Sequence, residues 1–395
     1  MFLVVNPGTH PAPRWLANGL ASQGAVHYLT ALGVVEGYGS RLLPRRVRAE
    51  WARRVLPPNL TRHNSSSGAP FTDLVYLAAR RSGHRKAIDT WRERRNRAVN
   101  RRAIRFLRRN AGQVDGVVTT ASACLDVAEY CVAHQIPLVS YLPQPYEKAD
   151  VRYVEEVNLA DGLLVASRYV AQSAAVGWGP ERIVVSNLGV DSPAGLPAPE
   201  PRVRDAGTSF KLIFVGRADP NKGLKYLLEA LSSLRDASRD VKLTVVSPDH
   251  LQLRGDLSLV SEVELVPAMS RTNLYRRFDQ HDVLVVPSLR EGFGLVVVEA
   301  LSRGLPVIVT TTTGAADVGL DEVAGLAVAP ADAKSLERAI ARLYDDPVEV
   351  ETFSRHAIKL AQRFSWPEYS VRTAELVTQL FGAIHAEGLS QTREV

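Results

Sequence analysis

The segment Glu291-Gly-Phe-Gly-Leu-Val-Val-Val-Glu299 places two glutamates eight positions apart at the start of an expected helix that runs to about Arg303. It follows Asp282-Val-Leu-Val-Val-Pro-Ser288, an apolar run that indicates a buried strand ending in a loop. Gly292 and Gly294 allow a ligand to approach the backbone closely, and the free N–H groups of a helix start suit an anion. In a mostly helical segment the glutamates lie roughly 12 Å apart, farther than the roughly 5–9.5 Å between paired glycosidase carboxylates. The spacing suits two hydroxylated groups joined by a diphosphate, although two unrelated glutamates are the simpler interpretation of this segment alone.

A second strand meets a helix further upstream. The apolar run Lys211-Leu-Ile-Phe-Val-Gly216 leads through Arg217-Ala-Asp-Pro-Asn-Lys-Gly223 into an amphipathic helix over residues 224–234. Arg217 offers a planar fork for phosphate oxygens, and Lys222 offers a mobile point charge beside a helix start. Taken alone, Lys222 is better interpreted as a solvated lysine of the Asp-Pro-Asn turn.

Together these two junctions resemble the group 1 retaining glycosyltransferases of the GT-B fold. The motifs occur in the order that the family has them, which makes the match specific. They are Phe214–Arg217, Lys222-Gly223, Pro287-Ser288, Glu291–Leu295, Glu299-Ala300 and Gly304–Ile308. Further matches resemble the end of the family's first domain and the entry to its last helix, at Ala160-Asp161, Ser167, Asn187–Asp191 and Phe364-Ser-Trp366.

The resemblance implies a role for each matched residue. Glu291 and the glycine amides that follow it would hold sugar hydroxyls, and Glu299 would hold the ribose. Arg217 and Lys222 would hold the diphosphate. We therefore predict that the catalytic residues are Arg217, Lys222 and Glu291. The predicted donor-binding residues are Gly8, Gly216, Arg217, Lys222, Glu291, Gly292, Phe293, Gly294, Leu295 and Glu299.

The implied fold class is α/β, with two Rossmann-like, doubly wound domains that face each other across a cleft and a C-terminal helix that crosses back to the first domain. A length of 395 residues fits two such domains. Residues 192–208, which hold four prolines and two glycines, have the most linker-like composition. We therefore expect an acceptor-binding domain over residues 1–192 together with the returning helix at 367–395, and a donor-binding domain over 209–366.

The alternation of apolar and polar residues predicts the individual elements. In the first half we expect strands at Phe2–Val5, Gly116–Thr120, Leu138–Tyr141 and Gly162–Ala166, and helices at Pro13–Gln23, 85–110 and Ala123–His134. In the second half we expect strands at 211–216, 241–246, 283–287 and 306–310, and helices at Ala333–Tyr344 and Pro367–Ala386.

Composition bears on compartment and cofactors. No apolar run reaches the roughly 18 residues that a membrane span needs, and Met1–Val5 is too short for a signal peptide. Cys124 and Cys131 lie on one predicted helix, roughly 10 Å apart and too far for a disulfide, so we expect a reducing cytoplasm. The histidines, cysteines and carboxylates show no metal-binding spacing. We expect no metal and no cofactor other than the nucleotide-sugar co-substrate.

The net charge of +6 comes from one segment. Residues 80–110 contain thirteen Lys and Arg against Asp89 and Glu93, a local charge of +11. We favour a helix that covers the first domain with a solvated basic face. A peripheral contact with anionic lipid at the inner face of the membrane, which would imply a lipid-linked acceptor, stays open and gains some support from the six arginines of Arg41–Arg54. Nucleic-acid binding is disfavoured because no reader motif accompanies the charge.

The match is weaker in the first domain. Asn6-Pro-Gly-Thr-His10 stands where the family often has a glycine pair, and Pro7 removes one backbone donor. Thr119-Thr-Ala-Ser122 stands where the family often has a histidine near the reacting carbon. His10 and His27 are candidates to replace that histidine in space, although each is better interpreted as an ordinary loop or helix-end residue.

The function implied by the resemblance is a metal-independent, retaining transfer of a sugar from a nucleoside-diphosphate sugar to an acceptor hydroxyl. The leaving phosphate would accept the hydroxyl proton in a front-face attack. Two alternatives stay open, a nucleotide-sugar epimerase of the same fold and a non-catalytic protein that binds a nucleotide sugar. The first would need acid and base residues that the first domain does not show, and the intact set from Arg217 to Glu299 disfavours the second. A dehydrogenase would need a G-x-G-x-x-G after a first strand, and neither half has one.

Overall fold

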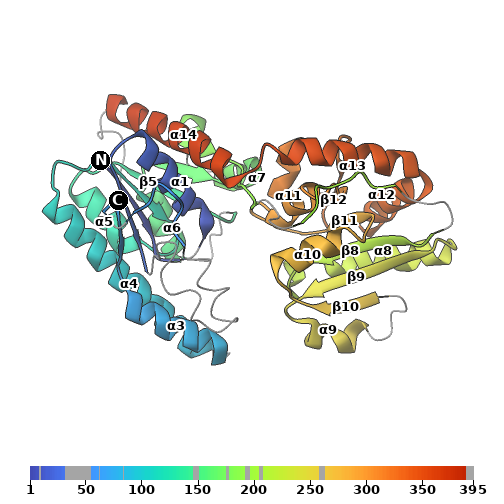
Figure 1. Cartoon of the computed structure of the whole chain (residues 1–395). Coiled ribbons are helices and arrows are strands. Elements are labelled where there is room, and N and C mark those ends of the chain that lie inside the picture. Colours follow the sequence, from blue (N-terminus) through green and yellow to red (C-terminus); the bar gives the residue numbers. More distant parts are fainter. Residues whose placement is uncertain are drawn as a thin grey trace. The chain divides into compact units, whose positions relative to one another are not determined.

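The computed structural model describes residues 1–8, 10–31, 55–61, 63–82, 84–145, 151–174, 178–191, 196–203, 208–257 and 263–387. The chain forms two compact units (Figure 1). Unit 1 comprises Met1–Val165, Ala171–Ser186 and Pro367–Val395, and unit 2 comprises Ala166–Val170 and Asn187–Trp366. The basic stretch Arg41–Arg54 lies outside the described residues.

The described part of unit 1 contains a parallel sheet of seven strands in the order β3-β2-β1-β4-β5-β6-β7. The strands are β1 Phe2–Asn6, β2 Val26–Thr30, β3 Ser65–Ser67, β4 Gly116–Thr120, β5 Leu138–Leu142, β6 Gly162–Val165 and β7 Ile183–Val185. Strands β5 and β6 are buried along their whole length, as expected for parallel strands with helices on both faces. The strand order reverses direction between β1 and β4, which makes that position the switch point of this sheet.

The helices of unit 1 come from both ends of the chain. They are α1 Pro11–Gln23, α3 Pro70–Ser82, α4 Arg85–Arg109, α5 Leu125–Ala133, α6 Val151–Asn158 and α14 Trp366–Glu387, while α7 Arg168–Ala174 is shared with unit 2. Helix α14 packs closely on this unit, because a Cβ atom on Gly19 would lie 2.0 Å from the carbonyl oxygen of Ser370. Phe381 of α14 also stacks on Phe2 of β1, with ring centroids 5.0 Å apart. The predicted return of the last helix to the first domain is confirmed.

Unit 2 contains, in its described part, a parallel sheet of six strands in the order β10-β9-β8-β11-β12-β13. The strands are β8 Phe210–Val215, β9 Val241–Ser247, β10 Val263–Pro267, β11 Val283–Val286, β12 Val307–Thr310 and β13 Gly325–Val328. The helices are α8 Leu224–Asp236, α9 His250–Leu257, α10 Arg271–Phe278, α11 Leu295–Leu301, α12 Ala333–Asp345 and α13 Pro347–Ala361, with single 3₁₀ turns at η3 Pro220–Lys222, η4 Gly314–Val318 and, in unit 1, η2 Pro180–Arg182. The predicted doubly wound α/β class is confirmed in both units.

The predicted elements agree with the structure to within two residues at nearly every end. The prediction left out several elements, among them the strands β2, β7, β10 and β13. It also left out β3, whose three residues are all serine and carry no apolar signal. This strand forms because its backbone pairs with β2, where Tyr28 lies opposite Ser65. The helix expected directly after Glu291 is the main error. Helix α11 begins only at Leu295, because Gly294 has a left-handed φ of 84°, so the distance estimate for a helical 291–299 segment does not apply.

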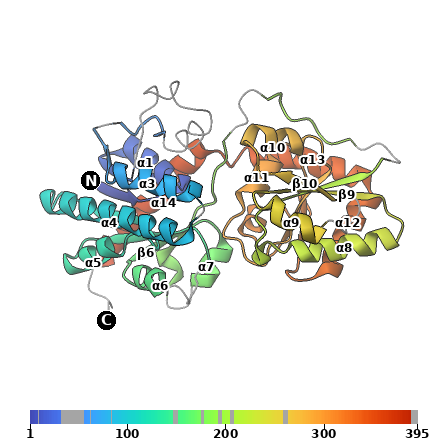
Figure 2. The same cartoon turned by 90° about the horizontal axis from the view of Figure 1, so that it is seen from below.

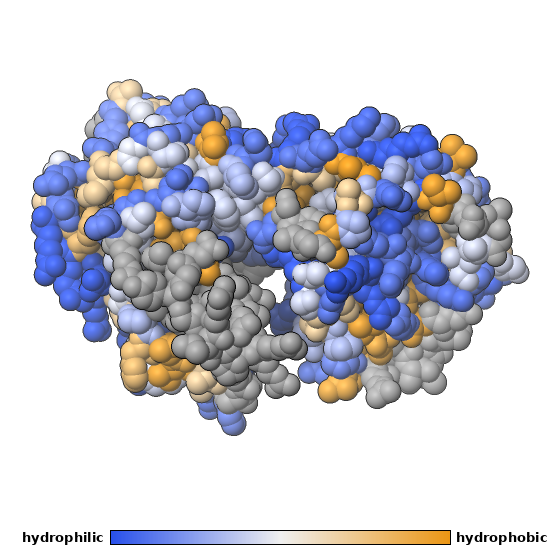
Figure 3. All heavy atoms as spheres, viewed as in Figure 1, coloured by the Kyte–Doolittle hydropathy of each residue, from blue (hydrophilic) through white to orange (hydrophobic). Residues whose placement is uncertain are grey.

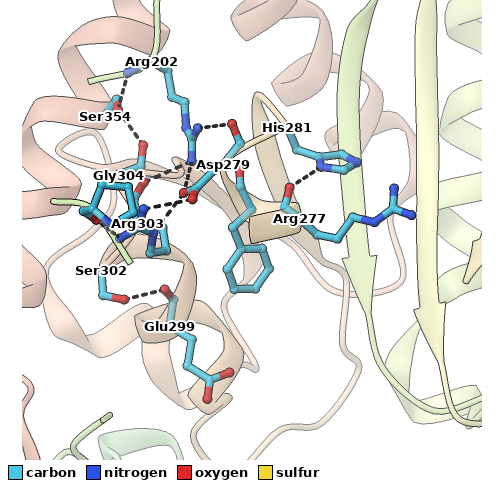
Figure 4. A network of polar contacts seen from close by, with 11 residues as sticks. Arg202, Arg277, Asp279, His281, Glu299, Ser302, Arg303, Gly304 and Ser354 are labelled. Atoms are coloured by element: carbon cyan, nitrogen blue, oxygen red, sulfur yellow. Dashed lines mark hydrogen bonds and ion pairs between the residues drawn. The ribbon is translucent and has the colours of Figure 1, made fainter. Parts of the chain in front are cut away.

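The division between the units falls at residue 186, a few residues before the predicted linker at 192–208. Part of that predicted linker packs firmly on unit 2 (Figure 4). The Arg202 guanidinium donates to the carbonyl oxygens of Asp279 at 2.7 Å and Phe278 at 2.8 Å. Arg303, which is 2% exposed, pairs with Asp279 at 2.9 Å and donates to the carbonyl of Pro197 at 2.9 Å. These contacts fix residues 197–202 to the body of unit 2.

Candidate functional site

The two sequence junctions meet at the switch point of the unit 2 sheet. Strand β8 lies between β9 and β11. The strands that follow β8 are therefore added first on one side of it, as β9 and β10, and then on its other side, as β11 to β13. In open sheets of this kind a ligand binds outside the carboxyl ends of the strands at that point. The loop that contains Arg217 and Lys222 follows β8, and the loop that contains Glu291 follows β11. The topology therefore places these loops next to each other.

Lys222 and Glu291 form an ion pair across this position, with Nζ donating to Oε2. Both side chains are partly buried, with 29% of the Lys222 side chain and 13% of the Glu291 side chain exposed. The backbone joins the same two loops, because the amide of Leu289 donates to the carbonyl of Asn221 at 2.7 Å. Gly223 makes this approach possible, since it has a φ of 67° and a Cβ atom there would lie 1.9 Å from the Pro287 oxygen.

The Glu291 loop is held by the segment after β12. The amide of Glu291 donates to the carbonyl oxygen of Thr312 at 3.1 Å, and the amide of Gly314 donates to the carbonyl oxygen of Glu291 at 3.0 Å. The Ser167 hydroxyl donates to the carbonyl of Gly292 at 2.7 Å. Within the part of the chain that the structure describes, the amides of Gly292, Phe293 and Gly294 donate to no protein acceptor. A fixed loop with such amides can bind the oxygen atoms of a ligand.

Arg217 lies at the same sheet edge but does not join the Lys222–Glu291 pair. Its side chain is 73% exposed, and Nε lies 4.0 Å from Oδ2 of Asp249. The preceding Gly216 is half-buried and donates its amide to the carbonyl of Val246 at 3.0 Å. A Cβ atom on Gly216 would lie 3.6 Å from Cγ of Lys222, so the Lys222 stem passes beside this glycine. Arg217 is thus an exposed cation beside a partly buried one.

Glu299 lies on α11 in a different set of contacts. Its Oε1 pairs with Nε of Arg271 at 2.8 Å, and Arg271 also pairs with Asp191. The carboxylate is 9% exposed, and burial raises its pKa while the Arg271 charge opposes the shift. Figure 4 shows the carboxylate of Glu299 directed away from the Arg303–Asp279 pair. The sequence did not single out Arg271, although its position in the first turn of the helix after β10 was a usable signal.

Gly8 lies in unit 1, whereas the other nine predicted donor-binding residues lie in unit 2. It follows β1 at the switch point of the unit 1 sheet. Its amide donates to Oδ1 of Asn6 at 3.2 Å, so this donor is used within the protein. Asn6 also donates to the carbonyl of His10 at 3.1 Å. The role of Gly8 in donor binding stays a prediction.

The two histidines considered for the first domain differ in position. His10 caps α1, where its Nδ1 accepts from the amide of Ala12 at 3.3 Å, and burial lowers its pKa to about 4. His27 lies near the amino end of β2, with its ring stacked on Phe106 at 4.3 Å and Nε2 2.8 Å from the Ser66 hydroxyl. Of the two, His10 lies at the carboxyl edge of the sheet, where ligands bind in this class of fold.

Glu156 is a buried carboxyl that the sequence did not identify. Its side chain has no exposed surface, and Oε2 accepts from the amides of Ala123 at 3.1 Å and Cys124 at 2.9 Å. Burial raises its pKa to about 8, more than these hydrogen bonds lower it. The group therefore caps the start of α5 in its protonated state at neutral pH.

Replacement of Glu156 by Gln should change the dependence of stability on pH. Because the folded-state pKa is raised from 4.5 to about 8, wild-type protein loses stability as pH rises through this window. The free energy of unfolding of Glu156→Gln relative to wild type should therefore increase from pH 5 to pH 8. Urea unfolding at several pH values measures it, with Glu155→Gln, a change at the exposed neighbouring residue, as the control. A constant difference across this range would contradict the assignment.

The described residues contain no group of three or more His, Cys, Asp or Glu side chains arranged to hold a metal ion. Among the helices in that part of the chain, none is both long and apolar enough to cross a membrane. Cys124 and Cys131 are buried free thiols.

Residues 200–360 match the family model described as glycosyl transferases group 1. This region is a group 1 glycosyltransferase domain. The domain contains every predicted donor-binding residue except Gly8. The Lys222–Glu291 pair and the Glu299–Arg271 pair both lie inside it.

The curated relatives match a little more than half of this chain. A D-inositol 3-phosphate glycosyltransferase 2 of Catenulispora acidiphila is 30% identical over 243 residues, which are 56% of this chain and 57% of that protein. An MMP alpha-(1->4)-mannosyltransferase of Mycolicibacterium hassiacum is 31% identical over 216 residues, 52% of this chain and 51% of that protein. The chain therefore spans between about half and three fifths of the length of the curated relatives it matches.

Several solved structures share the fold of nearly the whole chain. The lipopolysaccharide outer core galactosyltransferase WaaB has a TM-score of 0.66 at 14% identity, covering 96% of this chain and 100% of that one. Sucrose-phosphate synthase of Thermosynechococcus elongatus has a TM-score of 0.61 at 18% identity, covering 97% and 99%. HepE of Anabaena, solved with UDP, has a TM-score of 0.62 at 17% identity, covering 97% and 99%. The predicted GT-B fold is confirmed.

Proposed function

We propose that this protein is a glycosyltransferase that moves a sugar from a nucleoside-diphosphate sugar to an acceptor hydroxyl. The observation that carries the proposal is the Lys222–Glu291 ion pair at the switch point of a group 1 glycosyltransferase domain. The cation of this pair suits a phosphate, and the carboxylate beside it suits the hydroxyl groups of a sugar. The structures of HepE with UDP and with UDP-glucose support a donor of this class.

The charges at this edge suit the leaving group. As the bond between the sugar and the diphosphate breaks, negative charge grows on the diphosphate oxygens. Lys222 is held in place by Glu291, and Arg217 is exposed and free to turn toward a phosphate. Two cations aimed at developing charge stabilise the transition state more than the ground state.

Glu291 and Glu299 have separate roles in this proposal. Glu291 accepts hydrogen bonds from the sugar hydroxyls, and the amides of the loop Gly292–Gly294 donate hydrogen bonds to them. Glu299, which Arg271 holds at 2.8 Å, accepts hydrogen bonds from the ribose hydroxyls. A carboxylate with two acceptor oxygens suits a pair of neighbouring hydroxyls.

The transfer proceeds with retention in this proposal. The acceptor oxygen forms its bond to the anomeric carbon on the face from which the diphosphate departs. The hydroxyl proton passes to the departing phosphate oxygen, so that the acceptor needs no separate protein base. This part of the proposal rests on the resemblance of the motifs between Phe214 and Ile308 to retaining enzymes.

We place the enzyme in the cytoplasm, in peripheral contact with an anionic membrane through residues 85–110, and with a lipid-linked acceptor. The support is the basic face of α4, on which ten Lys and Arg are exposed. Such a segment is attracted to the negative surface of anionic lipid.

A donor panel tests the proposed reaction. The full chain is incubated with UDP-, GDP- and ADP-linked hexoses, with and without lipid extracts as acceptors, and release of the nucleoside diphosphate is measured. We expect release from one donor class, with product of unchanged anomeric configuration. If no donor is cleaved or transferred and calorimetry detects none of the three diphosphates binding, the proposal is wrong.

Activity should survive removal of divalent metal ions. Lys222 and Arg217 supply the positive charge that a magnesium ion would otherwise bring to the diphosphate. We expect the rate in EDTA to stay within about twofold of the rate in Mg²⁺, far less than the 10²–10³-fold cost of a lost charge-stabilising group. Loss of activity in EDTA that Mg²⁺ restores would contradict this assignment of the charge.

A further inference from the structure

The two helices α3 and α4 form a packed pair in unit 1. Figures 1 and 2 show α3 lying along α4 in both views. Arg95 of α4 is buried against α3, where it pairs with Asp73 at 3.6 Å and lies 4.3 Å from the ring of Tyr76. The side chains of Arg95 and Asp73 are only 8% and 2% exposed. This buried pair sets the orientation of the outer faces of both helices.

The centre of the apolar face of α4 is buried within the protein. Val99, Ala103 and Leu107 are at most 2% exposed. A helix that covers a sheet in this way cannot also lay that face into a membrane, so any contact between α4 and lipid must use the side that faces solvent. What α4 presents to solvent is its basic face, which comprises Arg85, Lys86, Arg92, Arg94, Arg97, Arg101, Arg102, Arg105, Arg108 and Arg109.

The charge on this face is only partly balanced. Arg92 pairs with Asp89 at 2.7 Å, and Arg97 pairs with Glu93 at 3.3 Å. From Arg94 to the end of the helix the sequence contains no Asp or Glu. The second half of α4 is therefore a row of like charges, which favours an extended anionic partner.

Helix α3 exposes an apolar face beside this row. Phe71 is 72% exposed and Leu74 is 51% exposed, and Ala78 on the same side of the helix is also exposed. The spacing of three and four residues puts them on one face. Figure 3 shows hydrophobic residues at the lower end of this helix pair, next to the hydrophilic row that follows α4. Large apolar side chains with this exposure are unfavourable in water and mark an interaction site when they adjoin each other.

We infer that α3 and α4 together dock on an anionic phospholipid bilayer, with the arginines of α4 on the headgroups and Phe71 and Leu74 of α3 entering the interface. A bilayer offers both partners side by side, a negatively charged surface and an apolar layer directly below it. A nucleic acid would satisfy the arginines but leave Leu74 and Ala78 in water. The inference deepens the membrane contact proposed above for residues 85–110 and rests on it, but it does not depend on the proposed sugar transfer.

Vesicle sedimentation with the full chain tests the inference. The probes are vesicles of phosphatidylcholine alone and of phosphatidylcholine with phosphatidylserine. We expect binding to the anionic vesicles only, weakening as salt rises because the Debye length falls to about 10 Å at 0.1 M. Gln at Arg94, Arg97, Arg101 and Arg105, which are all exposed, should abolish sedimentation and leave diphosphate binding unchanged.

The apolar part is tested with Phe71→Ser combined with Leu74→Ser. This variant should retain the salt dependence but bind anionic vesicles about tenfold more weakly, because less apolar surface is removed from water. Leu251→Ser is the matched control, since Leu251 is 70% exposed on α9 of unit 2. It should bind as wild type does. A tryptophan at position 71, made as Phe71→Trp, should show a blue-shifted emission on anionic vesicles and be quenched by brominated acyl chains.

Several results would overturn the inference. Wild-type protein that ignores anionic vesicles at low salt would make α4 a solvated cover and α3 an ordinary surface helix. Equal loss of binding in Leu251→Ser would show that the effect of the serines is not local. A tryptophan at position 71 that stays solvent-exposed on vesicles would rule out insertion. Tighter binding to a DNA or RNA oligonucleotide than to the vesicles would assign the arginines to nucleic acid.

Discussion

Replacement of Arg217 or Lys222 by alanine should lower turnover by roughly 10²–10³-fold while the protein stays folded. Each change removes one charge-assisted contact to the departing diphosphate, in a reaction whose barrier depends on charge developing there. Arg217 is 73% exposed and makes only a 4.0 Å contact with Asp249, so its loss should hardly affect stability. Lys222→Ala also leaves the partly buried Glu291 without its ion-pair partner, and its rate should fall at least as far.

The measurement is the release of nucleoside diphosphate at saturating donor, with thermal unfolding as the check on folding. Lys225→Ala is the matched control, because Lys225 is an exposed lysine three residues further along, on α8, and lies over the ring of Tyr226 at 4.7 Å. It should turn over as wild type does. Wild-type turnover in well-folded Arg217→Ala and Lys222→Ala proteins would contradict the proposal that the diphosphate binds at this edge of the sheet.

Glu299→Ala and Glu291→Ala should differ in kind. Glu299→Ala removes the carboxylate proposed to accept hydrogen bonds from the ribose. It should weaken binding of the free diphosphate product by roughly 10–100-fold, the range expected for hydrogen bonds to a charged group. Glu291→Ala removes a contact to the sugar, which the product lacks, and releases Lys222 from its ion pair. It should therefore leave product affinity intact while slowing sugar transfer.

Calorimetry with the diphosphate that the wild type releases decides between these outcomes. Glu299→Gln provides a further comparison, because it keeps one acceptor oxygen but loses the charge that pairs with Arg271 at 2.8 Å. Its affinity should lie between those of wild type and Glu299→Ala. Equal losses of product affinity in Glu291→Ala and Glu299→Ala would contradict the division of roles between the two carboxylates.

Much of the fold could be predicted from local pattern. A strand such as Val283–Val286 is marked by a short apolar run, and the turn residues that end it follow directly in the sequence. The strands β4 and β8 and the helices α12 and α14 were therefore predicted to within two residues. Strand β3 could not be predicted, because three serines become a strand only through the backbone of β2.

The sequence by itself determined that two doubly wound domains would form and which residues would occupy the loops after β8 and β11. Both follow from the spacing of apolar and turn residues along the chain, because strands and helices each have a fixed periodicity. Only the tertiary structure decided which of those residues meet. Lys222 pairs with Glu291 because β8 and β11 are neighbours in the sheet, and Glu299 pairs instead with Arg271 from the helix after β10.

The tertiary structure also decided how the basic helix is used. Its apolar positions were visible in the sequence, but a helix with one apolar face can bury it against a sheet or against lipid. Packing of Val99 and Leu107 within unit 1 leaves the basic face of α4 outside, and it leaves the apolar face of α3 exposed beside that face. The physical reason is that burial depends on the whole fold. The periodicity of a helix shows which of its faces is apolar, but it does not show which neighbouring element will cover that face.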